Sequence, residues 1–184
     1  MRAKGAPLTE LGTVINEHCM PAGSQPGIDA REALSLAAAY AKRGELEPAM
    51  IQLTQLLQAD PDHEIANGML AGIHAQLNMT DRAVAGYRRV LAINPDNALA
   101  RFQLGLLQVT SGHPREAVDT LRPCLTDKQD FLAHFYSALA LLELHRPEEA
   151  RALLVRASQR MPADHTLRPR LGELLERSTT PVSS

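Results

Sequence analysis

The sequence contains no tryptophan and few other aromatic residues. Aromatic residues make up 3% of its 184 positions, whereas 45% of the chain is hydrophobic. Strands favour aromatic and β-branched side chains, while alanine and leucine favour helices. Because alanine and leucine dominate the hydrophobic residues here, the composition favours an all-α fold.

A strong charge of one sign and long hydrophobic runs are also missing. The formal net charge is −2 at pH 7, from 19 basic and 21 acidic residues. Such a balance produces no strong field that would attract nucleic acid or anionic lipid. No segment has the length of a membrane span or of a signal-peptide hydrophobic region. We therefore expect a cytoplasmic protein that neither binds nucleic acid nor inserts into a membrane.

Cysteine is scarce, and motifs for catalysis are missing. Cys19 and Cys124 are the only cysteines, so the chain has no disulfide framework and fits a reducing compartment. We find no glycine-rich phosphate loop, nucleophile elbow or paired catalytic carboxylates. The histidines lack the spacing of metal ligands. The sequence thus predicts no enzymatic activity, no metal site and no cofactor.

The sequence does contain a repeat. Four alanines recur at intervals of 34, 34 and 33 residues, namely Ala49, Ala83, Ala117 and Ala150. In each unit a helical pattern runs to a break, and a second helical pattern follows the break. The breaks fall at Gly44, Asn78, Gly112 and His145. This period is typical of stacked helical hairpins, in which no single unit buries its own apolar face.

The phase of the repeat divides the chain into segments. We expect four repeats, at about 30–63, 64–97, 98–130 and 131–163, followed by a capping helix at about 166–178. These elements form one repeat domain over residues 29–178. Residues 1–28 show no repeat phase, and their prolines and glycines predict a flexible segment. Residues 179–184 are expected to be a disordered tail.

Local signals place the first helices of these repeats. Asp29 is a good helix cap, so the first helix should begin near Ala30. Leu36 belongs to its predicted buried stripe, together with Ala33, Ala37 and Tyr40. Asp62 is the expected cap of the corresponding helix in the second unit.

The third unit departs from the others. It is one residue short, and Gln129 stands where the other units have a closing proline. Pro123 falls inside its second helix, where proline removes a backbone hydrogen bond and clashes with the preceding turn. The sequence therefore predicts that this helix kinks or ends near Arg122, and that residues 120–130 are irregular.

The repeat resembles the tetratricopeptide repeat (TPR) family. The resemblance rests on leucine and a small residue in each first helix, a small turn residue, an alanine in each second helix and a closing proline. In the first unit these are Leu36, Ala37, Gly44, Ala49 and Pro61. The resemblance implies a right-handed α-solenoid of stacked antiparallel hairpins. It also implies a concave groove, lined by the first helices, that binds peptides or helices of partner proteins.

Groove positions follow from the same resemblance. In the first two units they hold mostly small or apolar residues, including Ile65 and Gly68. In the third and fourth units all eight are apolar, and most are large. We expect these eight to form the partner-binding groove: Leu99, Phe102, Leu106, Val109, Leu132, Phe135, Leu139 and Leu142.

The apolar groove suggests a function and leaves an alternative open. An adaptor or chaperone-like module would hold an apolar or amphipathic segment of another protein there. In the alternative, the chain is a self-assembling scaffold in which residues 1–28 fill its own groove or a neighbour's; filling a neighbour's groove would make it a homo-oligomer. The end-capping helix is a third candidate for covering these positions.

Overall fold

The protein is an array of paired helices. The computed structural model describes residues 29–126 and 130–178, and all regular structure in those ranges is helical. The α-helices are α1 (Ala30–Lys42), α2 (Leu46–Ala59), α3 (Glu64–Gln76), α4 (Thr80–Ile93), α5 (Ala98–Thr110), α6 (Pro114–Leu121), α7 (Phe131–Glu143), α8 (Pro147–Arg160) and α9 (Arg168–Arg177). A 3₁₀ helix, Arg122–Thr126, follows α6.

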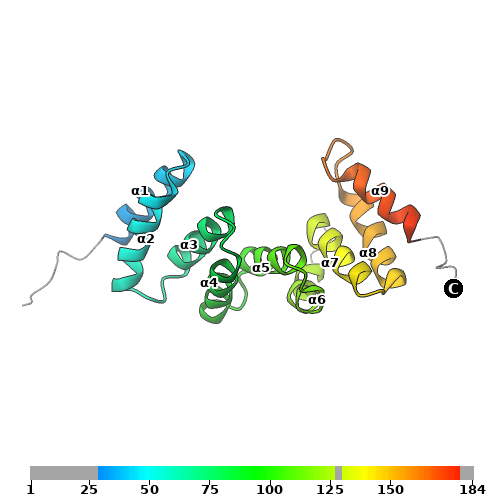
Figure 1. Cartoon of the computed structure of the whole chain (residues 1–184), viewed down its shortest axis with the longest axis horizontal. Helices are drawn as coiled ribbons and strands as arrows, with labels where there is room; N and C mark the ends of the chain where they lie inside the picture. Colours follow the sequence, from blue (N-terminus) through cyan, green and yellow to red (C-terminus); the bar gives the residue numbers. More distant parts are fainter. Residues whose placement is uncertain (1–28, 127–129, 179–184) are drawn as a thin grey trace, which may run out of the picture.

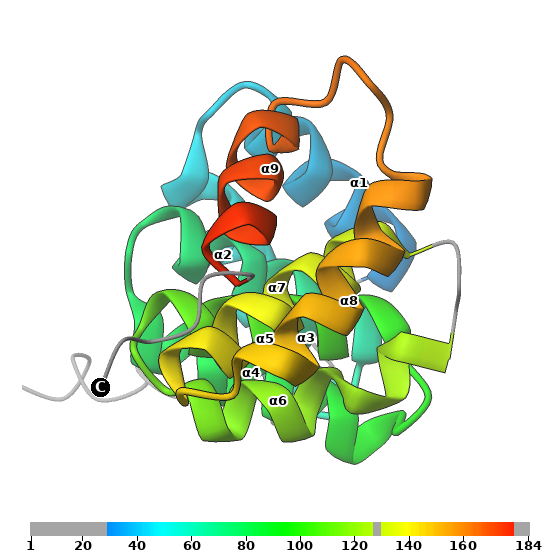
Figure 2. The same ribbon diagram turned by 90° about the vertical axis from the view of Figure 1, so that its right-hand side faces the viewer.

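Successive helices pack as antiparallel hairpins, and the hairpins follow one another along an arc (Figure 1). α5 lies on the inner side of the bend, and α6 lies on its outer side. Figure 2 views the array from its C-terminal end, with α8 and α9 in front of the other helices. The predicted all-α solenoid of stacked hairpins is confirmed. Within the described ranges, no helix is long and apolar enough to cross a membrane.

The turns inside the hairpins share one backbone conformation. Gly44 and Gly112 have φ angles of 79° and 74°, and Asn78 and His145 have φ angles of 57° and 56°. Positive φ is easy for glycine, and asparagine and histidine adopt it more often than most other residues do. The four predicted breaks are therefore equivalent left-handed turns.

Small buried residues hold the helices together. The four alanines that mark the repeat, Ala49, Ala83, Ala117 and Ala150, are all completely buried. A small side chain at these positions lets two helices approach closely. The interval between repeats in the sequence is thus the interval between equivalent buried positions in the core.

The caps of the first helices agree with the sequence at α1 and differ at α3. The Asp29 carboxylate accepts a hydrogen bond from the amide of Arg31 at 3.0 Å, and α1 begins at Ala30 as predicted. The prediction that Asp62 caps α3 is wrong, because the cap is His63. Asp62 instead forms an ion pair with Arg89, at 2.9 Å.

The predicted buried stripe of α1 is also wrong at one position. Ala33 and Ala37 are buried, but 41% of Leu36 is exposed. The equivalent leucine of α5, Leu104, is 4% exposed because it lies against a preceding hairpin. Among the described residues, no hairpin precedes α1, and Leu36 therefore has no such neighbour.

The break in the third unit lies where proline chemistry places it. α6 ends at Leu121 after 8 residues, whereas α2, α4 and α8 each have 14. The 3₁₀ helix that follows contains Pro123, whose carbonyl accepts a hydrogen bond from the Thr126 hydroxyl at 2.8 Å. The predicted end near Arg122 is confirmed, while residues 127–129 lie outside the described ranges.

α9 covers the apolar end of the array. Leu171 and Leu174 pack in one core cluster with Phe135 and Leu154. The Arg168 guanidinium donates to the carbonyl oxygens of Ser158 and Met161, at 2.7 and 2.8 Å, at the end of α8. Pro169 lies in the first turn of α9, where its missing amide is tolerated. The expectations for residues 1–28 and 179–184 fall outside the described ranges.

Gly105 offers a test of the close helix packing. A Cβ atom on Gly105 would overlap the side chain of Leu121, which is completely buried and cannot move aside. We expect Gly105→Ala to lower the free energy of unfolding by about 1–3 kcal/mol, since overpacking outweighs the gain in helix propensity. Urea denaturation measures this change.

Gly172 in α9 provides the matched control. A Cβ atom there would meet nothing within 4 Å. We expect Gly172→Ala to raise the free energy of unfolding by about 0.5–1 kcal/mol, because alanine is the better helix former. A stabilising effect of both substitutions would contradict the close approach of α5 and α6.

Candidate functional site

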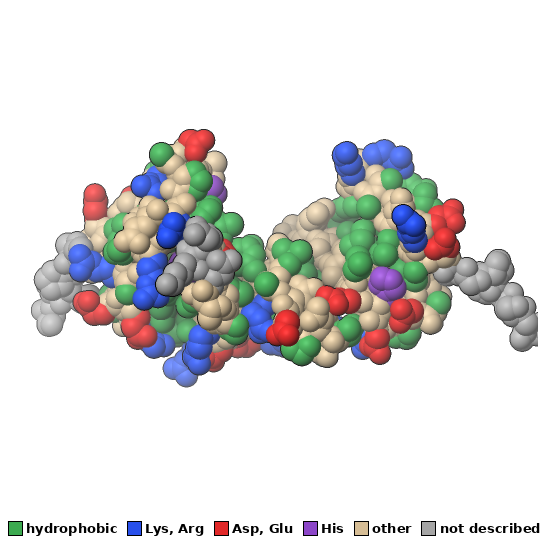
Figure 3. All heavy atoms as spheres, turned by 180° about the vertical axis from the view of Figure 1, so that it is seen from behind, with side chains coloured by type: hydrophobic (Ala, Val, Ile, Leu, Met, Phe, Trp, Pro, Cys, Tyr) green, Lys and Arg blue, Asp and Glu red, His purple; other side chains and the backbone are tan. Residues whose placement is uncertain are grey.

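Two large apolar side chains stand out on the first helices of adjacent hairpins. Leu99 is 69% exposed and Ile65 is 59% exposed, the two highest values among the large hydrophobic residues described. They lie 34 residues apart and occupy the same position in successive repeats. Both line a pocket of about 350 Å³, whose other apolar contributors are Gly68, Met69, Tyr87, Val90 and Ala100. In Figure 3 the surface is hollowed between the two raised ends of the array, and hydrophobic side chains line the hollow.

Polar residues fix the rim of this pocket. The Asn97 side chain caps α5, because its Oδ1 accepts a hydrogen bond from the amide of Ala100 at 2.8 Å. Its Nδ2 donates to the Glu64 carboxylate at 2.6 Å, and the Asn94 side chain donates to the same oxygen at 2.9 Å. Glu64 begins α3 and Asn97 precedes α5. These bonds therefore tie together the starts of the two helices that carry Ile65 and Leu99.

The same bonds perturb the titration of Glu64. Hydrogen bonds from Asn97 and Asn94 lower its pKa from the ordinary value of 4.5, because they stabilise the charged carboxylate. Glu64 is thus an anion at neutral pH and supplies the one charge in the lining of this mostly apolar pocket.

Aromatic contacts link the third and fourth hairpins. The Phe102 and Tyr136 rings lie edge to face, with centroids 6.0 Å apart. Phe135 and Tyr136 make a similar contact at 5.4 Å. Such pairs add about 0.5–1.5 kcal/mol beyond the burial of their area. α5 and α7 are therefore joined on their apolar side by a ring pair.

The structure separates the eight predicted groove residues into three groups. Leu99 is highly exposed. Five are partly exposed, namely Phe102, Leu106, Leu132, Leu139 and Leu142. Two of the eight, Val109 and Phe135, are buried and are considered next.

Phe135 and Val109 require a correction as contact residues, since neither side chain is available at the surface. Phe135 is 0% exposed because it packs within the core cluster that includes Leu154 of α8 and Leu171 of α9. Val109 is 7% exposed and clusters with Ala117 and Leu121 of α6. A charge at Phe135 would disrupt this core, so it cannot serve as a probe of binding.

α9 also covers part of the fourth hairpin's apolar surface. Leu139 and Leu142 line a pocket of about 460 Å³ together with Leu174 of α9. Arg170 and Arg177, also from α9, contribute polar groups to its wall. The apolar surface open to a partner is therefore shifted toward α3 and α5 relative to the predicted site.

Two groove residues were missed or undervalued in the sequence. Tyr136 was missed: it is partly exposed and contacts the groove residue Phe102, whereas its neighbour Phe135 is buried in a cluster with α8 and α9. Ile65 does carry a signal, because it shares the repeat phase of Leu99. Residues 29–126 and 130–178 contain no group of three or more histidine, cysteine, aspartate or glutamate side chains placed to hold a metal ion.

The chain is similar to known repeat proteins in sequence and in fold. Residues 66–97 match the tetratricopeptide repeat family. The solved structure of YrrB, described as a TPR protein with an unusual peptide-binding site, has a TM-score of 0.74 and is 18% identical, over 82% of this chain and 76% of that one. A structure of MamA AMB-1 has a TM-score of 0.67 and is 27% identical, over 74% of this chain and 82% of that one.

A relative known by sequence is much longer. The peroxisomal targeting signal receptor of Kluyveromyces lactis is 24% identical over 113 residues, which is 61% of this chain and 20% of that protein. This chain therefore spans about a fifth of the length of that relative.

The pKa of Glu64 tests the rim network. Because its folded-state pKa lies below the unfolded value of 4.5, Glu64 contributes stability above about pH 4.5, and this contribution is lost as the pH falls through the folded-state pKa. Asn97→Asp keeps an oxygen that can cap α5 but replaces the donor to Glu64 with a negative charge. We expect this substitution to raise the pKa of Glu64, as followed by the ¹³C shift of its carboxyl group during a pH titration. A wild-type pKa at or above 4.5 would contradict the network.

Proposed function

Because this chain is a tetratricopeptide repeat protein, and thus a protein interaction module, we propose that it acts as an adaptor or chaperone-like binder. Its partner presents an apolar or amphipathic segment to the concave groove. The observation that carries this proposal is the exposure of Leu99 and Ile65 on either side of one apolar pocket. Exposed leucine and isoleucine side chains at equivalent repeat positions are unfavourable in water unless a partner covers them.

The residues that line the groove favour binding of an apolar segment over binding of an acidic one. The pocket between α3 and α5 has no lysine or arginine among its lining residues, and its one charged group is the Glu64 carboxylate. An acidic segment would be repelled there. A segment with apolar side chains, and a donor such as a backbone amide or a lysine facing Glu64, fits both the walls and the rim.

The relatives are consistent with this reading. YrrB is described as having a peptide-binding site, and the Kluyveromyces lactis protein is named as a receptor for a targeting signal. The first description names a peptide as the ligand, and the second names a targeting signal. For this chain, the two descriptions support a polypeptide as the class of ligand. The residues proposed to contact that ligand come from the structure of this chain alone.

The alternative, a self-assembling scaffold, is supported by Leu36. This residue is 41% exposed at the first hairpin, whereas its equivalent in α5 is covered by the preceding hairpin. An apolar segment from residues 1–28, from the same molecule or a neighbour, would cover either this end or the groove. When the segment comes from a neighbour, the groove partner is a second copy of the chain.

A peptide library displayed on phage tests the first proposal. Leu99 is the second residue of α5 and is mostly exposed, so Leu99→Glu should not disturb folding. We expect peptides selected by the wild-type protein to carry apolar side chains, and Leu99→Glu to weaken their binding at least about tenfold, the effect of about 1.4 kcal/mol.

Ile51→Glu is the matched control, because Ile51 is 55% exposed on α2, the second helix of its hairpin. The Ile51→Glu variant should bind the selected peptides as tightly as the wild type does. Selected peptides that lack apolar residues, or that bind Leu99→Glu as tightly as the wild type, would overturn the proposal.

Light scattering distinguishes the self-assembling scaffold. If residues 1–28 mediate assembly, the full chain forms oligomers whose mass rises with concentration, and a variant that begins at Asp29 is a monomer. A full chain that stays monomeric at all concentrations would exclude the scaffold. Equal oligomers in both proteins would show that residues 1–28 do not mediate assembly.

A further inference from the structure

A second pocket lies on the side of α7 that faces away from the concave groove. Ser137 and Leu141 line it, each two residues away from Leu139 and therefore about 200° around the helix from that groove residue. Val118 of α6 and Leu153 of α8 provide apolar walls. The volume is about 280 Å³. We call this pocket, with its continuation described below, the α6–α8 crevice.

Pro123 accounts for the crevice. It stops α6 after 8 residues, six fewer than the 14 of α8, and a 3₁₀ helix follows. A full-length second helix would continue along α7, the helix of the fourth hairpin that α6 contacts. Because those turns are missing, parts of α7 and α8 that face α6 remain uncovered.

An unpaired hydroxyl lies in the wall of the crevice. Ser137 is 1% exposed, and its Oγ has no hydrogen-bond partner in the structure. A buried polar atom without a partner is unfavourable, and such atoms are rare in folded proteins. Since Ser137 also lines the pocket, a bound molecule can supply the missing hydrogen bond.

The rim of the crevice carries uncompensated positive charge. Arg122 is paired with Asp119 at 2.7 Å, and Arg146 is paired with Glu149 at 2.6 Å. Arg156 also lines the pocket but forms no ion pair with any residue of the described ranges. A carboxylate beside Arg156 would therefore gain a charge-assisted hydrogen bond that the protein itself does not make.

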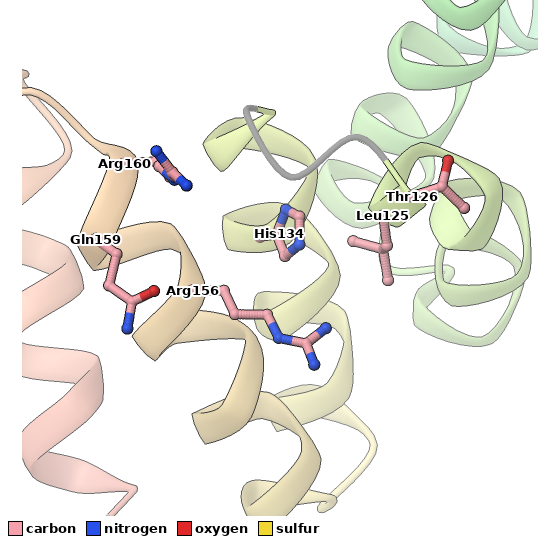
Figure 4. Close-up of a pocket in the computed structure, with 6 residues that line it drawn as sticks. All are labelled: Leu125, Thr126, His134, Arg156, Gln159 and Arg160. Atoms are coloured by element: carbon pink, nitrogen blue, oxygen red, sulfur yellow. The ribbon is translucent and has the colours of Figure 1, made fainter.

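The crevice is elongated. A second cavity of about 570 Å³ shares Leu125 and Arg156 with the first and extends to His134 and Arg160. Figure 4 shows Arg156 and Arg160 reaching from α8 on one side, Leu125 on the opposite side, and His134 of α7 between them. Arg160, like Arg156, has no ion pair in the described part of the chain. Two connected cavities with one shared apolar wall suit a linear chain better than a compact small molecule.

We propose that the α6–α8 crevice is a second binding site, for an extended segment of a partner protein in which an apolar side chain is flanked by acidic ones. The apolar side chain fills the space beside Leu141 and Leu153. A backbone group of the segment pairs with the Ser137 hydroxyl, and an acidic side chain binds Arg156. Because the crevice and the concave pocket between α3 and α5 share no lining residue, the protein can hold one segment in each.

NMR titration of the methyl-labelled full chain tests this site, with the peptide acetyl-Asp-Leu-Glu-amide as the probe. We expect saturable shifts of the Leu141 and Leu153 methyl groups, with the Leu99 methyl groups unmoved. The peptide acetyl-Asn-Leu-Gln-amide lacks the charges, and acetyl-Asp-Ser-Glu-amide lacks the apolar side chain. Each should bind at least about tenfold more weakly than acetyl-Asp-Leu-Glu-amide. Arg156→Gln should weaken the binding of acetyl-Asp-Leu-Glu-amide by a similar factor.

Arg151→Gln is the control, since Arg151 is exposed on the same helix and lines neither cavity. Its affinity for the peptide should match that of the wild type, and circular dichroism should show all variants folded. Ser137→Ala should weaken binding without lowering the melting temperature. The proposal is overturned if no saturable shift occurs, if the neutral peptide binds as well as the acidic one, or if only concave residues such as Leu99 respond. It also fails if Arg151→Gln and Arg156→Gln have equal effects.

Discussion

No hairpin in this chain can bury its own apolar surface, and the rest of the structure depends on that constraint. Each second helix presents an alanine that is completely buried against its neighbours, at Ala49, Ala83, Ala117 and Ala150. Close approach at these points brings leucines of adjacent helices into contact, which provides most of the favourable free energy available to such a fold. Stability is therefore distributed along the array, from one hairpin to the next.

The same constraint explains where the protein has surface to offer a partner. An apolar residue is covered only if a neighbouring element reaches it, and the positions that no neighbour reaches are few. Leu36 lies at the first hairpin, Ile65 and Leu99 lie on the inner side of the bend, and the crevice beside α7 lies where α6 is short. At the C-terminal end, Phe135 is buried in a core cluster formed with residues of α8 and α9. The two surfaces proposed for binding thus lie where the repeat is interrupted or left open.

Much of the fold could be predicted because it depends on local chemistry. Gly44 and Gly112 mark left-handed turns, Asp29 marks a helix start, and Pro123 marks a helix end. The failures concern contacts between elements. His63 rather than Asp62 caps α3, and choosing between two adjacent polar residues requires knowing that Asp62 is held by Arg89, 27 residues away.

The candidate site was less predictable for the same reason. Repeat phase identifies Leu99 and Ile65 as groove positions, and both are exposed. The same phase assigned Phe135 to the groove, but that residue is buried in a cluster that includes α8 and also α9, which lies outside the repeat. The unpaired Ser137 hydroxyl gave no sequence signal, because it depends on the gap that a proline opens in a different helix.

The central claim is that the concave pocket between α3 and α5 holds an apolar side chain of a partner polypeptide. Intermolecular nuclear Overhauser effects between a tightly bound apolar peptide and the methyl groups of Ile65 and Leu99 test it most directly. The account predicts contacts from one apolar side chain of the peptide to both residues. Contacts confined to the second helices of the hairpins, with none to Ile65 or Leu99, would contradict it.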